Sequence, residues 1–164
     1  MRMQSQKNNM EQMRLASLID DYALVTGWKN RAERDLTSGL SLVKSSIEYN
    51  GQPFAITLES DEKRQWITIT ITPPFRVIPA KLIDACLLVN FINENHSHPG
   101  KITVDDDGVL LYQDGINLEG IKLQHRLIET MLGSAFCLFH IHLANLAAVA
   151  LTRKTYEAIR REHA

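Results

Sequence analysis

Two pairs of histidines have the residue type and spacing that could hold a metal ion. His96 and His98 lie in "NHSHPG", and His140 and His142 lie in "FHIHL". Histidine nitrogens are common zinc ligands, but a structural zinc site needs four ligands that converge on one point. Residues two apart on a helix point about 200° away from each other, so the second pair cannot face one ion. We therefore predict no metal site, with His96 and His98 on a surface loop and His140 and His142 partly buried.

Three aspartates and a glycine follow the first histidine pair, in "VDDDGV" at 104–109. A calcium loop of the EF-hand type needs oxygen-bearing side chains at its first, third and fifth positions, and glycine at its sixth. If Asp105 took the first position, the fifth would be Val109, which has no side-chain oxygen. Consecutive aspartates followed by glycine are instead typical of a tight turn between two strands.

Cys137 and His140 are one helical turn apart, a spacing that could pair a nucleophile with a base. A reactive cysteine needs a partly exposed, electropositive setting, whereas "AFCLFH" is apolar. Cys86 also has apolar neighbours, so we predict two buried thiols in a reducing compartment rather than a disulfide. There is no glycine-rich phosphate loop and no Gly-X-Ser-X-Gly motif. The sequence thus predicts no catalytic residue, no cofactor and no enzyme; a small metal-dependent or cysteine hydrolase is the alternative.

Composition is that of one soluble domain. The chain has 164 residues, of which 45% are hydrophobic and 23% charged. Its formal net charge of −1 provides no overall field that would favour nucleic acid or an anionic membrane. Residues 1–10 are polar, without the apolar core of a secretory signal, so we expect a flexible tail, a single domain over 11–164 and a cytoplasmic location.

One stretch tests the soluble interpretation. Residues 132–151 contain no Asp, Glu, Lys or Arg and are about long enough to span a bilayer. His140, His142 and Asn145 interrupt the stretch near its middle, where polar groups are costly in lipid. We therefore favour a buried core or interface helix with no membrane span, and keep a membrane-associated factor as an alternative.

Hydrophobic periodicity predicts an α+β fold. The pattern of "RQWITITIT", 64–72, is that of a strand with Ile67, Ile69 and Ile71 on one face and threonines on the other. The charged connection 29–35 could be helical, and 27–43 is otherwise unassigned. The helix 80–95 is apolar nearly all round, which indicates burial on more than one side. The remaining expected elements are a helix over 13–25, three antiparallel strands over about 44–72, a hairpin of 101–105 and 109–115, and a long C-terminal helix from about 123, broken or bent at Gly133-Ser134.

This order of elements resembles the YbjN family, which is described as bacterial sensory-transduction regulators and is similar in fold to the type III secretion chaperones. The similarity is best over about 64–132. It is carried by "WITITITPPFRVIP", by "LLVNFINEN" with its spaced Asn90 and Asn93, and by "GKITVDDDGVLLYQDGINLEG". The resemblance implies an antiparallel sheet of about five strands with an N-terminal, an apolar central and a long C-terminal helix. It implies no catalytic residues.

We therefore expect a non-enzymatic protein-binding or regulatory module, chaperone-like in shape, in bacterial signalling or stress response. The alternation of 64–72 places Trp66, Thr68, Thr70 and Thr72 on the face opposite the isoleucines. Tryptophan is enriched at interface hot spots, so these four residues are the predicted partner-binding site for a protein or peptide. The two apolar helices leave more apolar surface than one small domain easily covers, which predicts a homodimer.

Overall fold

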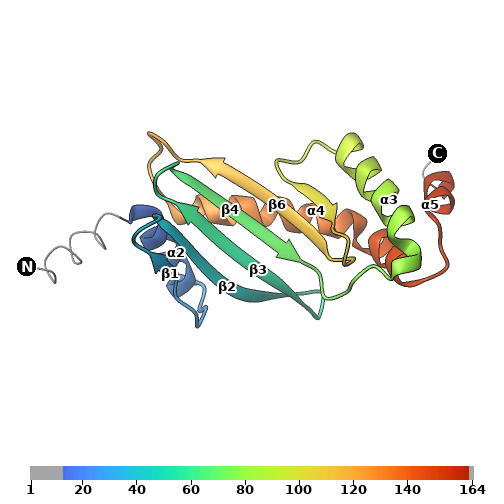
Figure 1. The fold of residues 1–164 in the computed structure, drawn as a ribbon, viewed down its shortest axis with the longest axis horizontal. Coiled ribbons are helices and arrows are strands. Elements are labelled where there is room, and N and C mark those ends of the chain that lie inside the picture. The colour runs from blue at the N-terminus through green and yellow to red at the C-terminus, as the bar shows by residue number, and fades with distance from the viewer. Residues whose placement is uncertain (1–12, 163–164) are drawn as a thin grey trace, which may run out of the picture.

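The computed structural model describes residues 13–162, which form an α+β fold with one six-stranded antiparallel sheet (Figure 1). The expected flexible tail, 1–10, lies outside the described residues. The elements in chain order are α2 (Arg14–Val25), β1 (Glu33–Asp35), β2 (Leu40–Tyr49), β3 (Gln52–Asp61), β4 (Trp66–Thr72), the 3₁₀ turn η1 (Pro79–Lys81), α3 (Leu82–Asn95), β5 (Lys101–Val104), β6 (Leu110–Asn117), α4 (His125–Leu151) and α5 (Tyr156–Glu162).

The strand order across the sheet is β1-β2-β3-β4-β6-β5. The first four strands form a meander, and α3 then leads to β5, which occupies the far edge while β6 pairs with β4. The α+β class is confirmed, but the expected count of about five strands is one too low. The extra strand is β1, which lies within the connection interpreted as possible helix. Its three residues are all charged and too few to display the period of a strand.

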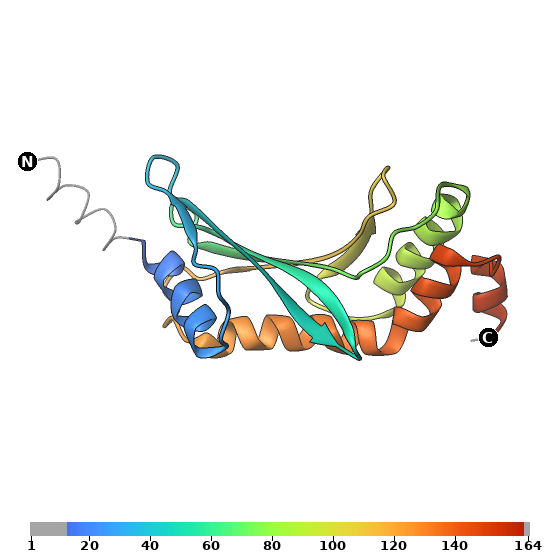
Figure 2. The ribbon, with the colours of Figure 1, turned by 90° about the horizontal axis from the view of Figure 1, so that it is seen from below.

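All the described helices lie on one face of the sheet (Figure 2). The long helix α4 runs beneath the strands, with α2 at one end of it and α3 with α5 at the other. We call the face toward α4 the inner face and the opposite one the outer face. As predicted, Ile67, Ile69 and Ile71 are buried on the inner face, where they join a core that includes Phe54 and Phe139.

The C-terminal helix is a single helix that continues through Gly133, so it is not divided into two helices there. The helix ends at Leu151, and α5 begins five residues later, at Tyr156. By length and composition α4 could cross a membrane. One side of it is buried against the sheet and the other helices. The buried residues are Ile128, Met131, Leu132, Ala135, Leu138, Phe139, His142, Leu146, Val149 and Ala150.

The central helix α3 is buried on one side only, which corrects the prediction of burial on more than one side. Ala85, Leu88, Val89 and Ile92 face the core. On the opposite side the side chains of Ile83 and Leu87 are 78% and 48% exposed. A helix that is apolar on all sides can be covered by its own chain or by a second copy, and the sequence pattern is the same in both cases.

The acidic segment after β5 is a turn, as predicted. The Asp105 carboxylate accepts hydrogen bonds from the backbone N–H groups of Asp107 and Val109, at 3.0 and 2.8 Å. Gly108 has a φ of +75° and its carbonyl accepts a hydrogen bond from Val77 N at 2.8 Å. A Cβ on Gly108 would overlap the Val77 carbonyl oxygen. The glycine is therefore required by both conformation and space.

A Gly108→Ala substitution is expected to lower the free energy of unfolding by about 2–5 kcal/mol, because left-handed strain and overpacking add. Gly120 is a matched control, since its φ is +71° but nothing lies within 4 Å of the position that an alanine Cβ would take. Gly120→Ala is expected to cost only about 1–2 kcal/mol. Urea denaturation of both variants measures the difference; equal losses would contradict the close contact with Val77.

Candidate protein-binding face

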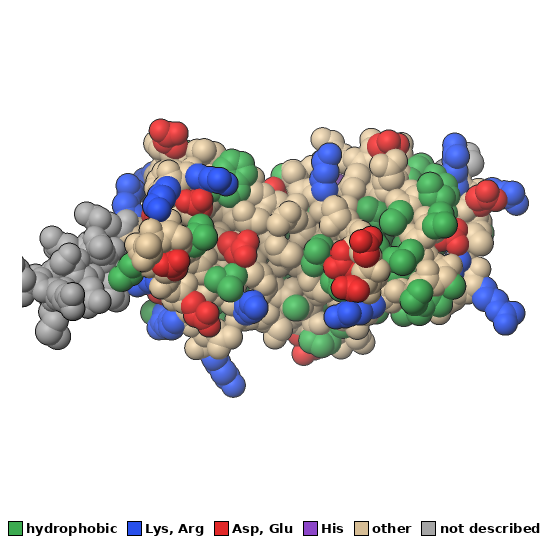
Figure 3. All heavy atoms as spheres, viewed as in Figure 1, with side chains coloured by type: hydrophobic (Ala, Val, Ile, Leu, Met, Phe, Trp, Pro, Cys, Tyr) green, Lys and Arg blue, Asp and Glu red, His purple; other side chains and the backbone are tan. Residues whose placement is uncertain are grey.

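The four residues of the predicted site lie together on the outer face of β4. Trp66 is 38% exposed, and Thr68, Thr70 and Thr72 are half-buried among neighbouring strands. Because β4 lies between β3 and β6, this row crosses the middle of the sheet rather than an edge. Figure 3 views this face and shows an uncharged band across the middle of the molecule. Water can solvate the threonine hydroxyls of this band, while the threonine methyl groups remain available for apolar contact with a partner.

The Trp66 ring lies over Gly115 of the neighbouring strand β6. A Cβ on Gly115 would stand 2.5 Å from Nε1 of Trp66, so the missing side chain makes room for the indole. Thr68 is the direct cross-strand partner of Gly115. Sequence reasoning missed this glycine; an isolated glycine within a strand is a signal of close approach by another group.

A groove of about 880 Å³ opens on the outer face beside Trp66. It extends the predicted site across β3 and β2 to the edge strand β1. Sequence reasoning missed this part of the face, because β1 and the start of β2 lay in the unassigned segment. The lining residues are Glu33, Arg34, Asp35, Leu40, Ser41, Leu42, Glu59, Ser60, Asp61, Arg64, Trp66 and Thr68.

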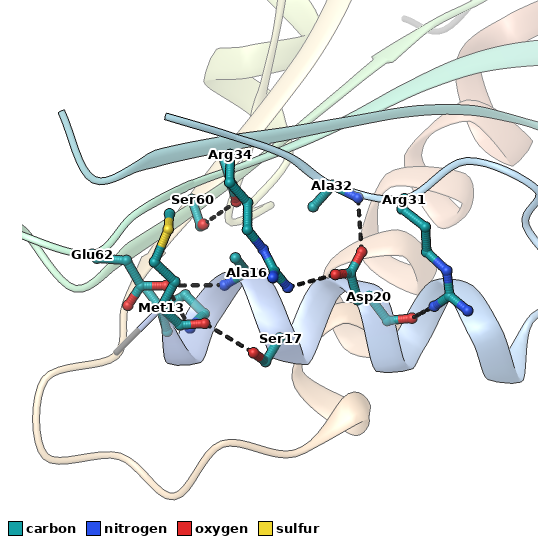
Figure 4. A network of polar contacts seen from close by, with 11 residues as sticks. Met13, Ala16, Ser17, Asp20, Arg31, Ala32, Arg34, Ser60 and Glu62 are labelled. Carbon is teal, nitrogen blue, oxygen red and sulfur yellow. Dashed lines mark hydrogen bonds and ion pairs between the residues drawn. The ribbon is translucent and has the colours of Figure 1, made fainter. Parts of the chain in front are cut away.

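A polar network on the opposite side fixes the edge of this groove (Figure 4). The Asp20 carboxylate of α2 accepts hydrogen bonds from the Ala32 N–H, at 2.7 Å, and from the Arg34 guanidinium of β1. Glu62, in the turn after β3, accepts the N–H groups of Leu15 and Ala16 at 2.7 and 3.0 Å and so caps the first turn of α2. Strand β1 and the residue before it are thus linked to α2 through Asp20.

The histidines are arranged partly as predicted. His140 is exposed and its Nδ1 lies 3.1 Å from the Tyr49 hydroxyl, whereas His142 is buried, so the two diverge. One member of each pair does meet, because the ring centroids of His96 and His142 are 4.3 Å apart. His98 stacks on His96 at 6.0 Å. Over residues 13–162 no group of three or more His, Cys, Asp or Glu side chains could hold a metal ion.

Both cysteines are exposed and free, which corrects the prediction of buried thiols. Apolar neighbours in sequence do not require burial on a helix, because each residue of the segment faces a different direction. Cys86 stands beside the exposed Leu87 of α3, and Cys137 lies on the solvent side of α4. The imidazole that could have served as a base for Cys137 is the one that contacts Tyr49.

Replacing Gly115 with alanine is expected to displace the Trp66 indole into solvent and shift its fluorescence emission to longer wavelength. Gly133→Ala is the control, since a Cβ at that helical position would meet nothing within 4 Å. Trp28 contributes to emission in both variants, so the measurement is made in a Trp28→Phe background, which isolates Trp66. An unchanged spectrum in Gly115→Ala would show that the indole does not depend on this glycine.

Comparison with known proteins shows the fold and leaves the family resemblance as a prediction. No protein-family model and no curated protein matches this sequence. A chain in the crystal structure of the ExsC–ExsE complex is similar over 81% of this chain and 93% of its own, with 16% identity and a TM-score of 0.54. Chains in the HopA1–SchA chaperone–effector complex and in the complex of the Yersinia pestis type III secretion chaperone SycH with a fragment of YscM2 are 19% and 12% identical. Their TM-scores are 0.46 and 0.43, over 79% and 82% of this chain and 93% and 98% of theirs. The chain has a type III secretion chaperone-like fold.

Proposed function

We propose that this protein is a non-enzymatic, chaperone-like binding module that holds a segment of a partner protein on the outer face of its sheet. The observation that carries the proposal is the one-sided architecture. All described helices cover the inner face, and the outer face leaves a tryptophan 38% exposed in the middle of the sheet (Figure 2). The fold shared with a chain of the ExsC–ExsE complex, a structure of two proteins bound together, supports this role.

Strand addition at the edge of β2 is a second physical route to the same partner. Strand β1 pairs only with residues 40–42 of β2, so the rest of that ten-residue strand forms the sheet edge. Unpaired N–H and C=O groups on such an edge can bind an extended peptide. The Lys44 carbonyl on this strand is already paired, because it accepts a hydrogen bond from the Asn30 side chain at 2.6 Å.

The biological setting of this proposal comes from the resemblance to the YbjN family. It is a regulatory role in bacterial signalling or stress response. The cytoplasmic location is proposed separately, on the ground that both cysteines are free. The fold comparison supports the binding role, while the regulatory role depends on the family resemblance alone. Stoichiometric recovery of a named regulator or secreted protein in a pull-down would identify the setting.

Replacing Trp66 with Ala and Thr70 with Lys is expected to weaken binding of a partner purified from such a pull-down by about thirtyfold, as for an interface hot spot. The circular dichroism melt should remain nearly unchanged, because both residues lie on the outer face. Thr130→Lys on the exposed side of α4 is the control and should bind normally. If binding persists in the double variant, or if Trp66→Ala alone unfolds the domain, Trp66 is a core residue and this face is not the site.

We propose further that the protein is a homodimer formed through the exposed side of α3. Ile83 and Leu87 are one helical turn apart and together form an apolar strip on the surface. Exposed apolar patches usually mark contacts, and a two-fold pair is the commonest closed assembly. In that arrangement the same strip of each chain covers the other.

Light scattering at micromolar concentration is expected to give twice the 18.6 kDa chain mass. Ile83→Glu should give the chain mass itself, because a buried unpaired carboxylate opposes association. Leu24→Glu is the matched control, since Leu24 is 62% exposed on α2, away from α3. A wild-type protein with only the 18.6 kDa mass would contradict the dimer.

A further inference from the structure

The groove beside Trp66 has a regular alternation of charge across its strands. Cross-strand pairing puts Asp35, Leu40, Asp61 and Trp66 in one row over β1, β2, β3 and β4. The row beside it contains Glu33, Leu42, Glu59 and Thr68 in the same strand order. Every acidic residue of these rows is on β1 or β3, and the residues between them on β2 are leucines.

The groove is therefore an apolar channel between two acidic walls. Neighbouring strands are about 5 Å apart, so β1 and β3, which carry the carboxylates, are about 10 Å apart with the leucines of β2 between them. Figure 3 shows hydrophobic, acidic and basic side chains mixed at this end of the outer face. A segment lying along β2 would place apolar side chains on the leucines and could reach a carboxylate on either side.

The walls carry negative charge that the described residues leave largely uncompensated. Over residues 13–162, neither Glu33 nor Glu59 has an ion-pair partner. Asp35 accepts hydrogen bonds from the Ser38 hydroxyl and from nearby backbone N–H groups, which, together with the charge of Lys63, lower its pKa and keep it ionised. Of the two arginines of the lining, Arg34 points to the inner face and binds Asp20.

The second arginine compensates only one wall. Arg64 Nε lies 3.6 Å from the Asp61 carboxylate, and the guanidinium side chain is 84% exposed. A surface pair of this kind contributes little and is easily exchanged for another cation. The groove thus retains an excess of carboxylates around an apolar floor, a combination that repels nucleic acid and acidic segments.

We propose that this groove binds an extended, cationic and amphipathic segment of a partner protein, in which Lys or Arg alternates with apolar residues. The inference rests on the proposed function and gives the chemistry of its ligand. The leucines and Trp66 bury the apolar side chains of the segment, and the β1 and β3 carboxylates pair with its cations. Electrostatic complementarity of this kind selects partners more than it adds raw affinity.

The test uses three short fluorescein-labelled peptides, in which valine alternates with lysine, with threonine or with glutamate, and measures binding by anisotropy. The lysine–valine peptide is expected to bind most tightly, and its affinity should fall as ionic strength is raised. The double variant Glu33→Gln/Glu59→Gln should weaken that binding by about five- to tenfold at low ionic strength. Asp106→Asn/Asp107→Asn, with the same change in net charge in the β5–β6 turn, should bind as the wild type does.

Other outcomes overturn the inference and separate it from the proposed function. Trp66-dependent binding of all three peptides with equal affinity, unaffected by Glu33→Gln/Glu59→Gln, would refute the charge selection while leaving the outer face as a binding site. Equal weakening by both double variants would reduce the effect to net charge alone. If Glu33→Gln/Glu59→Gln changes the mass of the assembly in light scattering but leaves peptide binding unchanged, the occupant of the groove is a second copy of this chain. If none of the three peptides binds, the groove is not a peptide site. This conclusion does not depend on the result of the Trp66→Ala/Thr70→Lys binding experiment.

Discussion

Burial of one face of the sheet against α4 is the constraint on which the rest of the molecule depends. Ile67, Ile69 and Ile71 are at most 1% exposed, and each contributes about 1.5–3 kcal/mol through removal of its side chain from water. A helix of 27 residues is about 40 Å long, enough to lie under the whole width of the strands. Once this helix occupies the inner face, α2 and α3 pack at its two ends on the same side, and no described helix covers the outer face.

The two faces then differ in chemistry because strand side chains alternate. The inner face is a largely apolar core in which Ser41, Ser60 and Asp114 are the buried polar side chains of the strands, whereas the outer face has threonines in its centre, acidic residues with leucines at one end and a single tryptophan between them. Such a surface is too polar to be part of an apolar core, and it has apolar groups that a partner could cover. The absence of a side chain at Gly115 lets Trp66 lie against the sheet, where both the indole and the neighbouring channel remain accessible.

The sequence predicts the parts of this structure whose period is long and regular. Strand β4 is evident from its alternation, and the turn at Asp105–Gly108 from its residue types. Strand β1 could not be predicted, because three charged residues carry no period and only pairing with β2 makes them a strand. The charged rows of the groove could not be predicted either, since they appear only when the register of four strands is known. The exposure of Cys86, Ile83 and Cys137 was missed because composition along the chain does not show the direction in which a helix presents each residue.

The position of α4 in the chain has a consequence for synthesis. The meander β1–β4 has only pairings between strands that are neighbours in sequence, but the long helix that covers its inner face is made after all six strands. Until residues up to about 150 have emerged, the isoleucine row of β4 and the phenylalanine of β3 face solvent. The nascent chain therefore exposes an apolar sheet face until α4 has been made. Aggregation competes most strongly with folding in the interval between translation of β4 and translation of α4.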